Sequence, residues 1–404
     1  YIERIKFKIG NVGKYVTVKR PDPRTLKMPA PGSTPSLMDI IKEKIRLNGP
    51  ITVAEYMHIV VTNPTEGYYM KKDAIGHAGD FITSPEISQL FGEVLAIWFL
   101  AETRKMSHGK PLNIVELGPG NGTLMLDILK VVRRLDYEPN DLYIHLVEIS
   151  DTMRETQARN LCISHRATEL DLPYNYEGET ISGIKVRWYN DLKKVPNNFS
   201  WYIAHEFFDV LPIHKFEVKL KIVLIDIDDA GKLRTGLEIS ARSLGIARQL
   251  GDRVDKYGGI ALIADYGHEG EKEDTFRAFY KHQVVDPLEN PGECDLTADV
   301  DFSQLRVAVA KTPTYENYAV VCGPVKQRDF LERMQGEIRL QVLLENAKSD
   351  EVREKVKLAY EMLVDPNKMG DRFKFMAFYP SSVGQILEKY PPLGFSKPLK
   401  DPDQ

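Results

Sequence analysis

The sequence has few cysteines, and its histidines form no recognised metal-binding pattern. Its 404 residues include only Cys162, Cys294 and Cys322, which are far apart and form no C-x-x-C pair. A disulfide framework and a cysteine-based zinc site are therefore not expected, and the usage suits a reducing compartment. None of the nine histidines belongs to an H-E-x-x-H pattern, so no metal site is predicted.

Long apolar runs and a surplus of basic residues are also absent. No run of about 18 apolar residues exists, so we predict no membrane span and no stable membrane insertion. Lys and Arg number 54 against 58 Asp and Glu, and the resulting net charge of −4 argues against a nucleic acid as partner or substrate. With 43% hydrophobic and 28% charged residues, the composition is that of an ordinary globular protein. The length of 404 residues predicts two or three domains, or one domain with large insertions.

The N-terminal segment is basic and rich in proline. Residues 1–30 carry eight Lys and Arg against Glu3 and Asp22, and five prolines lie between residues 21 and 35. A basic leader with few acids is similar to the tail of an organelle transit peptide, and a solvated basic arm is an equal alternative. We predict a leader and extended linker over 1–35, with ordered structure beginning near Ser36.

Strand-type and helix-type segments alternate from residue 111 onward. Apolar runs suited to buried strands lie at 112–117, 143–150, 186–189, 201–206, 259–267, 318–323 and 373–379. Amphipathic helices are predicted at 36–49, 51–60, 87–106, 123–135, 152–161, 241–257, 327–334, 338–347 and 349–364. A hairpin is predicted from 221–228 and 233–240. This alternation predicts an α/β fold with a doubly wound sheet.

A glycine-rich segment, Glu116-Leu117-Gly118-Pro119-Gly120-Asn121-Gly122, lies between the first predicted core strand and the helix that follows. Glycines there allow a tight turn and close approach of a ligand to the backbone. A dinucleotide fingerprint requires glycine where Thr123 stands, which disfavours a nicotinamide-dependent oxidoreductase. The pattern instead resembles the first motif of class I S-adenosylmethionine methyltransferases, in which the acidic residue, here Glu116, helps to hold the methionine end of the cofactor.

Two further acids follow the next predicted strands. Glu148 ends the second strand, where a carboxylate can accept hydrogen bonds from both ribose hydroxyls. Asp191 follows the third strand and is a candidate partner of the adenine amino group. Each acid taken singly is as well explained as a helix cap or a solvated loop acid. Together with the glycine-rich loop, they predict a site for S-adenosyl-L-methionine.

The fourth predicted strand ends in the sequence His205-Glu206-Phe207-Phe208-Asp209. Ligands of open α/β sheets bind at the carboxyl ends of central strands, so these two acids are expected at a buried site. Buried carboxylates need a partner, and a cationic acceptor would supply one. His205 is a candidate to orient Glu206 or relay a proton, or it is satisfied by a backbone carbonyl.

Six segments in order resemble the MidA family of mitochondrial protein-arginine methyltransferases, which serve in the assembly of respiratory complex I. The segments are GDFITSPEISQLFGE (79–93), VELGPGNGTL (115–124), EFFDVLP (206–212), ADYGHEG (264–270), DLTADVDFS (295–303) and KMGDRFKF (368–375). The resemblance implies a type II enzyme of the mitochondrial matrix that makes symmetric ω-dimethylarginine on a core subunit of NADH:ubiquinone oxidoreductase. It favours the transit-peptide interpretation of the leader.

The implied fold is the class I methyltransferase (Rossmann-like) fold with added helices. We expect a helical N-terminal cap at 36–107, a methyltransferase core at 108–295 and a helical insertion with one core strand at 296–372. The final strand and tail occupy 373–404.

The chemistry of arginine assigns a role to each candidate residue. A guanidinium with a pKa above about 12 is a poor nucleophile, and Glu206 with Asp209 can grip it and localise its charge away from the attacking nitrogen. Aromatic side chains are expected to exclude water or simply to pack in the core: Tyr68, Tyr69, Phe81, Phe207 and Phe208. The loop before the 87–106 helix offers Asp80, Thr83 and Ser84 as cofactor-binding residues in a lid over cofactor and acceptor. Alternatively or in addition, Ser84 caps that helix with Pro85 at its first position.

Two alternative functions remain open at this stage. The chain is a methyltransferase for another protein side chain or a small molecule, or it is an assembly chaperone that uses the fold as a binding platform. The intact set of cofactor-loop glycines and acids argues against a degenerate site.

Overall fold

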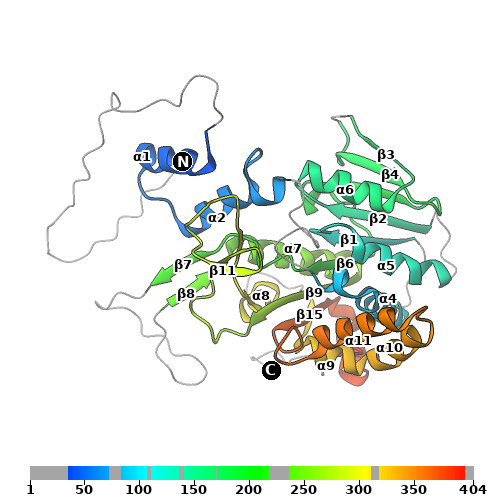
Figure 1. Cartoon of the computed structure of the whole chain (residues 1–404). Helices are drawn as coiled ribbons and strands as arrows, with labels where there is room; N and C mark the ends of the chain where they lie inside the picture. The colour runs from blue at the N-terminus through cyan, green and yellow to red at the C-terminus, as the bar shows by residue number, and fades with distance from the viewer. Residues whose placement is uncertain are drawn as a thin grey trace. The chain divides into compact units, whose positions relative to one another are not determined.

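The computed structural model describes residues 35–71, 83–106, 111–135, 141–169, 171–217, 236–310 and 318–395 (Figure 1). The chain divides into two compact units, residues 1–51 and 52–404. In the first unit, α1 (Leu37–Asn48) is the predicted helix at 36–49. It begins with a capping box between Ser36 and Asp39 and ends at Gly49, whose φ of +88° suits glycine.

A central sheet dominates the second unit. Its strand order is β14 (Val320–Lys326), β15 (Phe373–Tyr379), β9 (Gly259–His268), β6 (Ser200–His205), β1 (Leu112–Leu117), β2 (Leu142–Val147), β5 (Lys185–Tyr189), β4 (Tyr176–Glu179) and β3 (Ser164–Ala167). The strands from β9 to β5 are parallel, and β15 runs antiparallel to both of its neighbours. From β1 the chain continues to β2 and β5 on one side, and β6 and β9 lie on the other. The order of strands therefore reverses between β1 and β6, where ligands bind in such sheets.

Helices cover both faces of this sheet (Figure 1). On one face, α4 (Gln89–Thr103), α5 (Thr123–Val132) and α9 (Gln327–Arg333) pack with Ile114 of β1 in one apolar cluster. On the other face, α7 (Ala241–Tyr257) and α8 (Phe302–Val309) pack with Val115 and Leu117 of the same strand. Successive residues of a strand point to opposite faces, which explains why β1 is apolar almost throughout. The predicted doubly wound sheet is confirmed.

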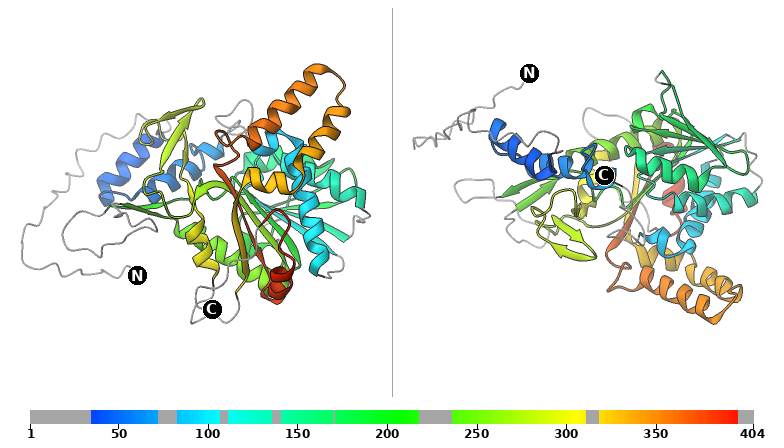
Figure 2. Two further views of the ribbon diagram at one scale, coloured as in Figure 1. Left: turned by 90° about the horizontal axis from the view of Figure 1, so that it is seen from below. Right: turned by 45° about the horizontal axis from the view of Figure 1, so that its top comes forward.

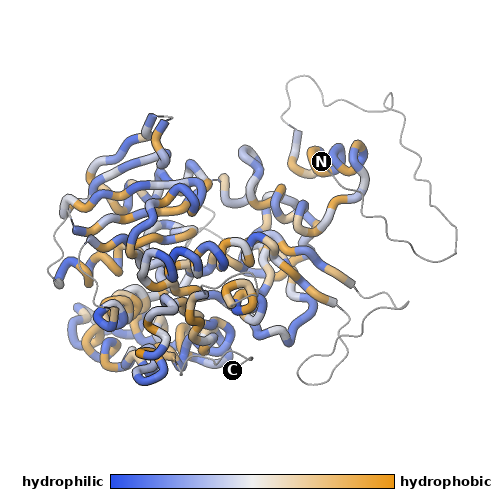
Figure 3. The backbone as a smooth tube through the Cα atoms, turned by 180° about the vertical axis from the view of Figure 1, so that it is seen from behind, coloured by the Kyte–Doolittle hydropathy of each residue, from blue (hydrophilic) through white to orange (hydrophobic). Residues whose placement is uncertain are grey.

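The helical insertion lies beside the first helical layer. α10 (Gly336–Glu345) and α11 (Asp350–Val364) form a pair next to α4 (Figure 2). Arg339 of α10 makes a two-pronged ion pair with Glu93 of α4, at 2.5 and 2.8 Å. Figure 3 shows that the helices alternate between apolar and polar residues along the backbone, as amphipathic helices do.

Two small sheets extend the core. β10 (Arg277–Tyr280) lies between β11 (Gln283–Val285) and β12 (Asp295–Thr297), and β7 (His214–Glu217) pairs with β8 (Gly236–Ile239). Of the predicted hairpin, residues 221–228 lie outside the described residues, and the partner of β8 is β7. The remaining elements are α2 (Val53–Thr62), η2 (Tyr68–Met70), α3 (Ser84–Ile87), η3 (Arg104–Met106), η4 (Arg133–Leu135), α6 (Asp151–Leu161), η6 (Leu192–Lys194), β13 (Val300–Asp301), η7 (Ser381–Val383) and α12 (Gly384–Lys389). None of the described helices is both long and apolar enough to cross a membrane.

Candidate functional site

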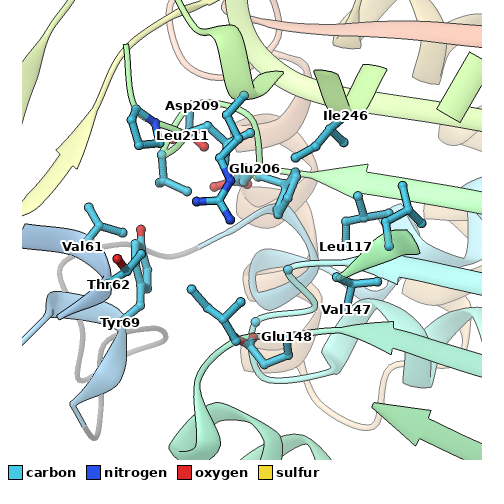
Figure 4. Close-up of a pocket in the computed structure, with 18 of the residues that line it drawn as sticks. Val61, Thr62, Tyr69, Leu117, Val147, Glu148, Glu206, Asp209, Leu211 and Ile246 are labelled. Atoms are coloured by element: carbon cyan, nitrogen blue, oxygen red, sulfur yellow. The ribbon is translucent and has the colours of Figure 1, made fainter. Parts of the chain in front are cut away.

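A cavity of about 430 Å³ opens at the carboxyl ends of the central strands. Figure 4 shows Val147 and Glu148 on one side of it and Glu206 with Asp209 on another, while Tyr69 faces them from η2. We call the first region the glycine-loop end: Leu117, Gly118, Gly120, Val147, Glu148 and Asp191. We call the second the carboxylate end: Tyr69, Glu206, Asp209, Tyr266 and Asp295. The cavity lies at the point where the strand order reverses, as expected for a ligand site.

The glycine-rich loop depends on backbone conformations that other residues rarely adopt. Gly118, Gly120 and Gly122 have φ values of +62°, +53° and +82°. A Cβ atom at Gly118 would lie 2.8 Å from Cδ2 of Phe207, so this glycine also permits close packing between the two ends of the cavity. Gly118 and Gly120 line the cavity, and the turn is closed by the Gly122 N–H, which donates to the Pro119 carbonyl at 2.7 Å.

Glu116 carries an unpaired carboxylate oxygen in the interior. The side chain is buried, and its Oε2 atom finds no hydrogen-bond partner among the residues that the structure describes. Burial raises the pKa of Glu116 to about 8. Leaving a carboxylate oxygen unpaired in this way is costly unless a ligand supplies a donor or a positive charge. Although Glu116 is not among the residues that line the cavity, its unpaired oxygen fits a cationic group such as the methionine end of S-adenosyl-L-methionine.

Glu148 is held in place by two donors. Its Oε1 accepts from the Ser150 N–H at 2.8 Å, and its Oε2 accepts from Nε2 of Gln157 at 3.0 Å. Gln157 also donates to the Gly120 carbonyl at 2.7 Å, so one amide connects the acid to the glycine-rich loop. Burial raises the pKa of Glu148. Sequence reasoning missed Gln157, because an amide inside a helix carries no pattern of its own.

Asp191 has the capping role that the sequence left open. Its Oδ1 accepts from the Lys193 N–H at 2.9 Å, which makes it the N-cap of η6. The residue also lines the cavity. A capping role and a ligand role are compatible here, because the side chain has a second oxygen.

Glu206 adopts a conformation that is unusual for a residue with a side chain. Its φ is +47°, and its N–H donates to the Ala264 carbonyl at 3.0 Å. Such conformations are strained and persist where the surroundings hold them. Its Oε1 accepts from the Ser84 N–H at 3.1 Å, and burial raises the pKa of Glu206 to about 8. The strained backbone directs a largely buried carboxylate into the cavity.

Asp209 is the second carboxylate of this end. Its Oδ2 accepts a hydrogen bond from the Tyr266 hydroxyl, whereas Oδ1 is buried and without a partner among the described residues. Burial raises the pKa of Asp209 to about 6, although the Tyr266 hydrogen bond and the charge of Arg277 both act to lower it. The guanidinium of Arg277 lies over the Tyr266 ring, 5.2 Å from its centre. Asp209 thus offers one free oxygen to a donor in the cavity.

Two acids that the sequence did not assign complete the carboxylate end. Asp265 accepts at Oδ2 from the N–H groups of Phe207 and Phe208, at 3.1 and 2.9 Å, and thereby fixes the turn that carries Glu206. Asp295 accepts from the Tyr69 hydroxyl at 2.8 Å. Burial raises the pKa of Asp265. Both acids lie in segments that carried the family resemblance, ADYGHEG and DLTADVDFS. That resemblance was the signal in the sequence that could have identified them as site residues.

His205 lies behind Glu206. Its Nε2 is 3.3 Å from Oε1 of Glu206 but does not form a hydrogen bond with it. Burial lowers the pKa of His205 to about 3, so the contact is not an ion pair at neutral pH. Its ring stacks against Phe373 at 6.5 Å between ring centres. The contacts are those of a neutral, packed imidazole.

The loop before α4 differs from the prediction that Ser84 caps a single long helix. Thr83, not Ser84, is the N-cap of α3, and Pro85 is the second helical residue. The predicted long helix is also interrupted at Ser88, which is extended and caps α4. Capping by Ser84 is therefore wrong, because Ser84 is already the first helical residue of α3 and Ser88 caps α4. Thr83 lines the cavity, and the Ser84 hydroxyl is buried without a partner among the described residues.

The predicted aromatic residues fall into three groups. Tyr69 and Phe207 line the cavity, and Tyr68 packs edge-on against Tyr69 at 5.1 Å. Phe208 belongs to the apolar core beneath the sheet. Phe81, like Asp80, lies outside the described residues. Within the described part of the chain, no three His, Cys, Asp or Glu side chains are arranged to hold a metal ion.

Comparisons with known proteins agree on one family. The model of the Methyltransf_28 family of S-adenosyl-L-methionine-dependent methyltransferases matches residues 94–235 and 218–318. The chain is 44% identical to the protein named protein arginine methyltransferase NDUFAF7 homolog, mitochondrial, of Drosophila melanogaster, over 97% of this chain and 100% of that protein. It is 43% identical to the protein named protein arginine methyltransferase NDUFAF7, mitochondrial, of Homo sapiens, over 87% and 85%.

A solved structure gives the same fold. A protein of Burkholderia thailandensis, crystallised with S-adenosyl-homocysteine, superposes with a TM-score of 0.65 at 22% identity. The superposition covers 85% of this chain and 91% of that one. The predicted family resemblance and fold class are confirmed.

Proposed function

Because the chain belongs to the family of S-adenosyl-L-methionine-dependent methyltransferases whose relatives are named mitochondrial protein arginine methyltransferases, we propose that it methylates arginine in a protein substrate, with Glu206 and Asp209 as the residues that hold the acceptor. The observation that carries this proposal is the placement of these two buried carboxylates in the same cavity as the glycine-rich loop. A guanidinium is planar, always charged and suited to forked hydrogen bonds with carboxylates. A cationic acceptor favours the ionised forms of these two carboxyl groups, whose pKa values burial raises, whereas a neutral or anionic acceptor does not.

The residues of the glycine-loop end are suited to hold the cofactor. We assign the methionine end to Glu116 with the backbone of Gly118 and Gly120, the ribose to Glu148 and the adenine to Asp191. The positive-φ glycines, the orphaned oxygen of Glu116 and the oriented carboxylate of Glu148 support this assignment. When bound, S-adenosyl-L-methionine supplies a methyl group on a positively charged sulfur.

The chain itself contributes orientation, charge and exclusion of water. Glu206 and Asp209 grip the guanidinium so that one nitrogen is free to attack, and most of the rate gain comes from this alignment. Tyr69 and Phe207 cover the cavity and keep water from the reacting groups. Of the two carboxylates, Glu206 has the higher pKa, about 8, and is the better acceptor for the proton that leaves the methylated nitrogen.

The finer points of the proposal concern product, client and place. We assign the enzyme to type II, with symmetric ω-dimethylarginine as product and a core subunit of NADH:ubiquinone oxidoreductase as client. The mitochondrial matrix is the proposed location. The resemblance to the MidA family and the word mitochondrial in the names of the relatives support these points. The division into a cap (36–107), core (108–295) and insertion (296–372) also stays a prediction.

Product analysis tests the proposal directly. The protein is incubated with methyl-labelled S-adenosyl-L-methionine and candidate complex I core subunits, and the labelled residues are identified by mass spectrometry after hydrolysis. Symmetric dimethylarginine on one subunit is the expected result. Label on another side chain or a small molecule would contradict the arginine assignment. Binding of a subunit without label transfer would favour the chaperone alternative.

A further inference from the structure

A very short helix connects the two ends of the cavity. α3 has four residues, and the N–H of its first residue, Ser84, donates to Oε1 of Glu206 at 3.1 Å. Two residues later, Oε1 of Glu86 accepts from the Thr123 hydroxyl at 2.6 Å and from Nδ2 of Asn121 at 3.3 Å. One turn of helix therefore contacts both the carboxylate that faces the acceptor and the loop that faces the cofactor.

This turn is built to keep its shape. The N–H of Ile87 donates to the Thr83 carbonyl at 3.0 Å, and that of Ser88 donates to the Ser84 carbonyl at 3.2 Å. Pro85 is buried, and its ring fixes the backbone φ at the second helical position. Because the backbone of the turn is fixed, we expect a displacement of Glu86 to move the Ser84 amide with it.

Thr123 gives the contact with Glu86 its specificity. It stands where a dinucleotide-binding loop would have its third glycine, and it is the first residue of α5. A carboxylate near the N-terminus of α5 is favoured on electrostatic grounds alone. That explanation accounts for the contact between Glu86 and Thr123. It does not explain why the Ser84 N–H, on the same turn, donates to Glu206.

We propose that Glu86 is a positioning residue that couples the glycine-rich loop to Glu206 through α3. The loop conformation that Glu86 holds through Asn121 and Thr123 then also sets where the Glu206 carboxylate lies. When a bound cofactor orders the loop, the Glu206 carboxylate is also positioned, before the acceptor binds. The inference rests on the proposed function for the identity of the acceptor, but its tests use no acceptor.

The first test is a titration of the protein with S-adenosylhomocysteine by calorimetry. Glu86→Gln and Thr123→Val should each weaken binding by about five- to tenfold, because the first removes the negative charge of the acceptor and the second removes the hydroxyl that donates to it. The double variant should be no weaker than either single variant, since both act on one contact. Glu155→Gln is the matched control: Glu155 accepts from the Tyr176 hydroxyl at 2.7 Å and should leave the affinity unchanged.

The second test measures coupling through the helix. Thr123→Val and Glu206→Gln alter groups at opposite ends of α3, and their effects on the free energy of unfolding should be less than additive. In a Glu86→Ala background the same two changes should become additive, because the connection is gone. A purely structural role for Glu86 would lower stability in that background without changing the additivity.

The outcomes separate this inference from the proposed function. Unchanged S-adenosylhomocysteine affinity in Glu86→Gln, or additive effects of Thr123→Val and Glu206→Gln in the parent chain, would overturn the coupling even if arginine methylation is intact. Loss of coupling in the Glu86→Ala background would support it, even if product analysis identifies a different acceptor.

Discussion

At the glycine-loop end of the cavity the chain contributes mainly backbone, whereas at the carboxylate end it contributes buried side chains. The loop from Glu116 to Gly122 is a single segment, and its glycines create the turn by their own conformations. The carboxylate end is assembled from η2, β6, β9 and β12, and its acids are held by tyrosine hydroxyls and backbone amides. A small ligand recognised through backbone needs one local motif, whereas a protein side chain held by charge needs groups from many segments.

The two ends also differ in how many buried carboxyl groups they contain, and therefore in how much free energy their burial costs. Several carboxyl groups at or beside the carboxylate end have raised pKa values because they are buried, among them Glu206, Asp209 and Asp265. Burying like charges together opposes folding, and an incoming cation relieves that cost. The carboxylate end is therefore expected to be more stable with a cationic ligand bound than when it is empty. Three changes below, Glu206→Gln, Glu148→Ala and Tyr266→Phe, are expected to affect one end and spare the other.

Removing the charge of Glu206 should have the largest effect. Glu206→Gln retains an oxygen that can accept from the Ser84 N–H but removes the attraction for a guanidinium. Turnover should fall by roughly a hundredfold or more, which is the scale for loss of one transition-state electrostatic partner. Affinity for S-adenosylhomocysteine should stay within about twofold, since the change spares the glycine-loop end. Steady-state kinetics and calorimetry on one preparation check this, and normal turnover would contradict the catalytic assignment.

Glu148→Ala should give the converse result. Loss of the ribose contacts should weaken S-adenosylmethionine and S-adenosylhomocysteine alike by about 1.5–3 kcal/mol, the range for charge-assisted hydrogen bonds. The KM for the protein acceptor should not change. Calorimetry with both ligands and with a ribose-free methionine analogue provides the measurement and its control. An equal loss for the analogue would show that Glu148 acts elsewhere.

Tyr266→Phe should produce a smaller, pH-dependent defect at the carboxylate end. The hydroxyl of Tyr266 lowers the pKa of Asp209, so its removal should shift protonation of Asp209 to higher pH. The acid limb of the kcat/KM profile should move upward, with a loss of about tenfold or less at neutral pH and recovery in alkali. Tyr202→Phe is a matched control, because that buried hydroxyl has no partner among the described residues. Equal profiles for both variants would rule out this role.

The smallest effect concerns stability of the ligand-free protein. The pKa of Glu206 is raised to about 8 in the folded chain, so its contribution to stability is fully present below its ordinary value of 4.5 and is lost as the pH rises through 8. Glu206→Gln should make the unfolding free energy less dependent on pH between 5 and 8, by about 1 kcal/mol or more. Urea unfolding at several pH values measures this. An unchanged dependence in the variant would contradict the raised pKa of Glu206.

Much of the fold is predictable from local pattern. The segments 112–117, 241–257 and 373–379 form β1, α7 and β15 with the predicted bounds. The two strands are almost uniformly apolar, and the helix is a long amphipathic segment that ends at Gly258. The short strands β10, β11 and β12 were not predicted, since three or four residues of mixed polarity carry no period. The break at Ser88 was missed for a related reason: the apolar positions on both sides of it continue one helical pattern.

The sequence by itself determined the strands at the centre of the sheet, the glycine-rich loop and the acids at the ends of those strands, but not β3 and β4 at its edge. The predicted features depend on periodicity and on glycine conformations, which are local properties of the chain. Only the tertiary structure decided that Tyr69, Tyr266 and Asp295 share a cavity with Glu206 and Asp209, and that Asp265 holds the turn between them. It likewise decided that Glu86 contacts Thr123, 37 residues away. Such contacts arise from the strand order and from close packing across the sheet, and no residue involved carries a signal that names its partner.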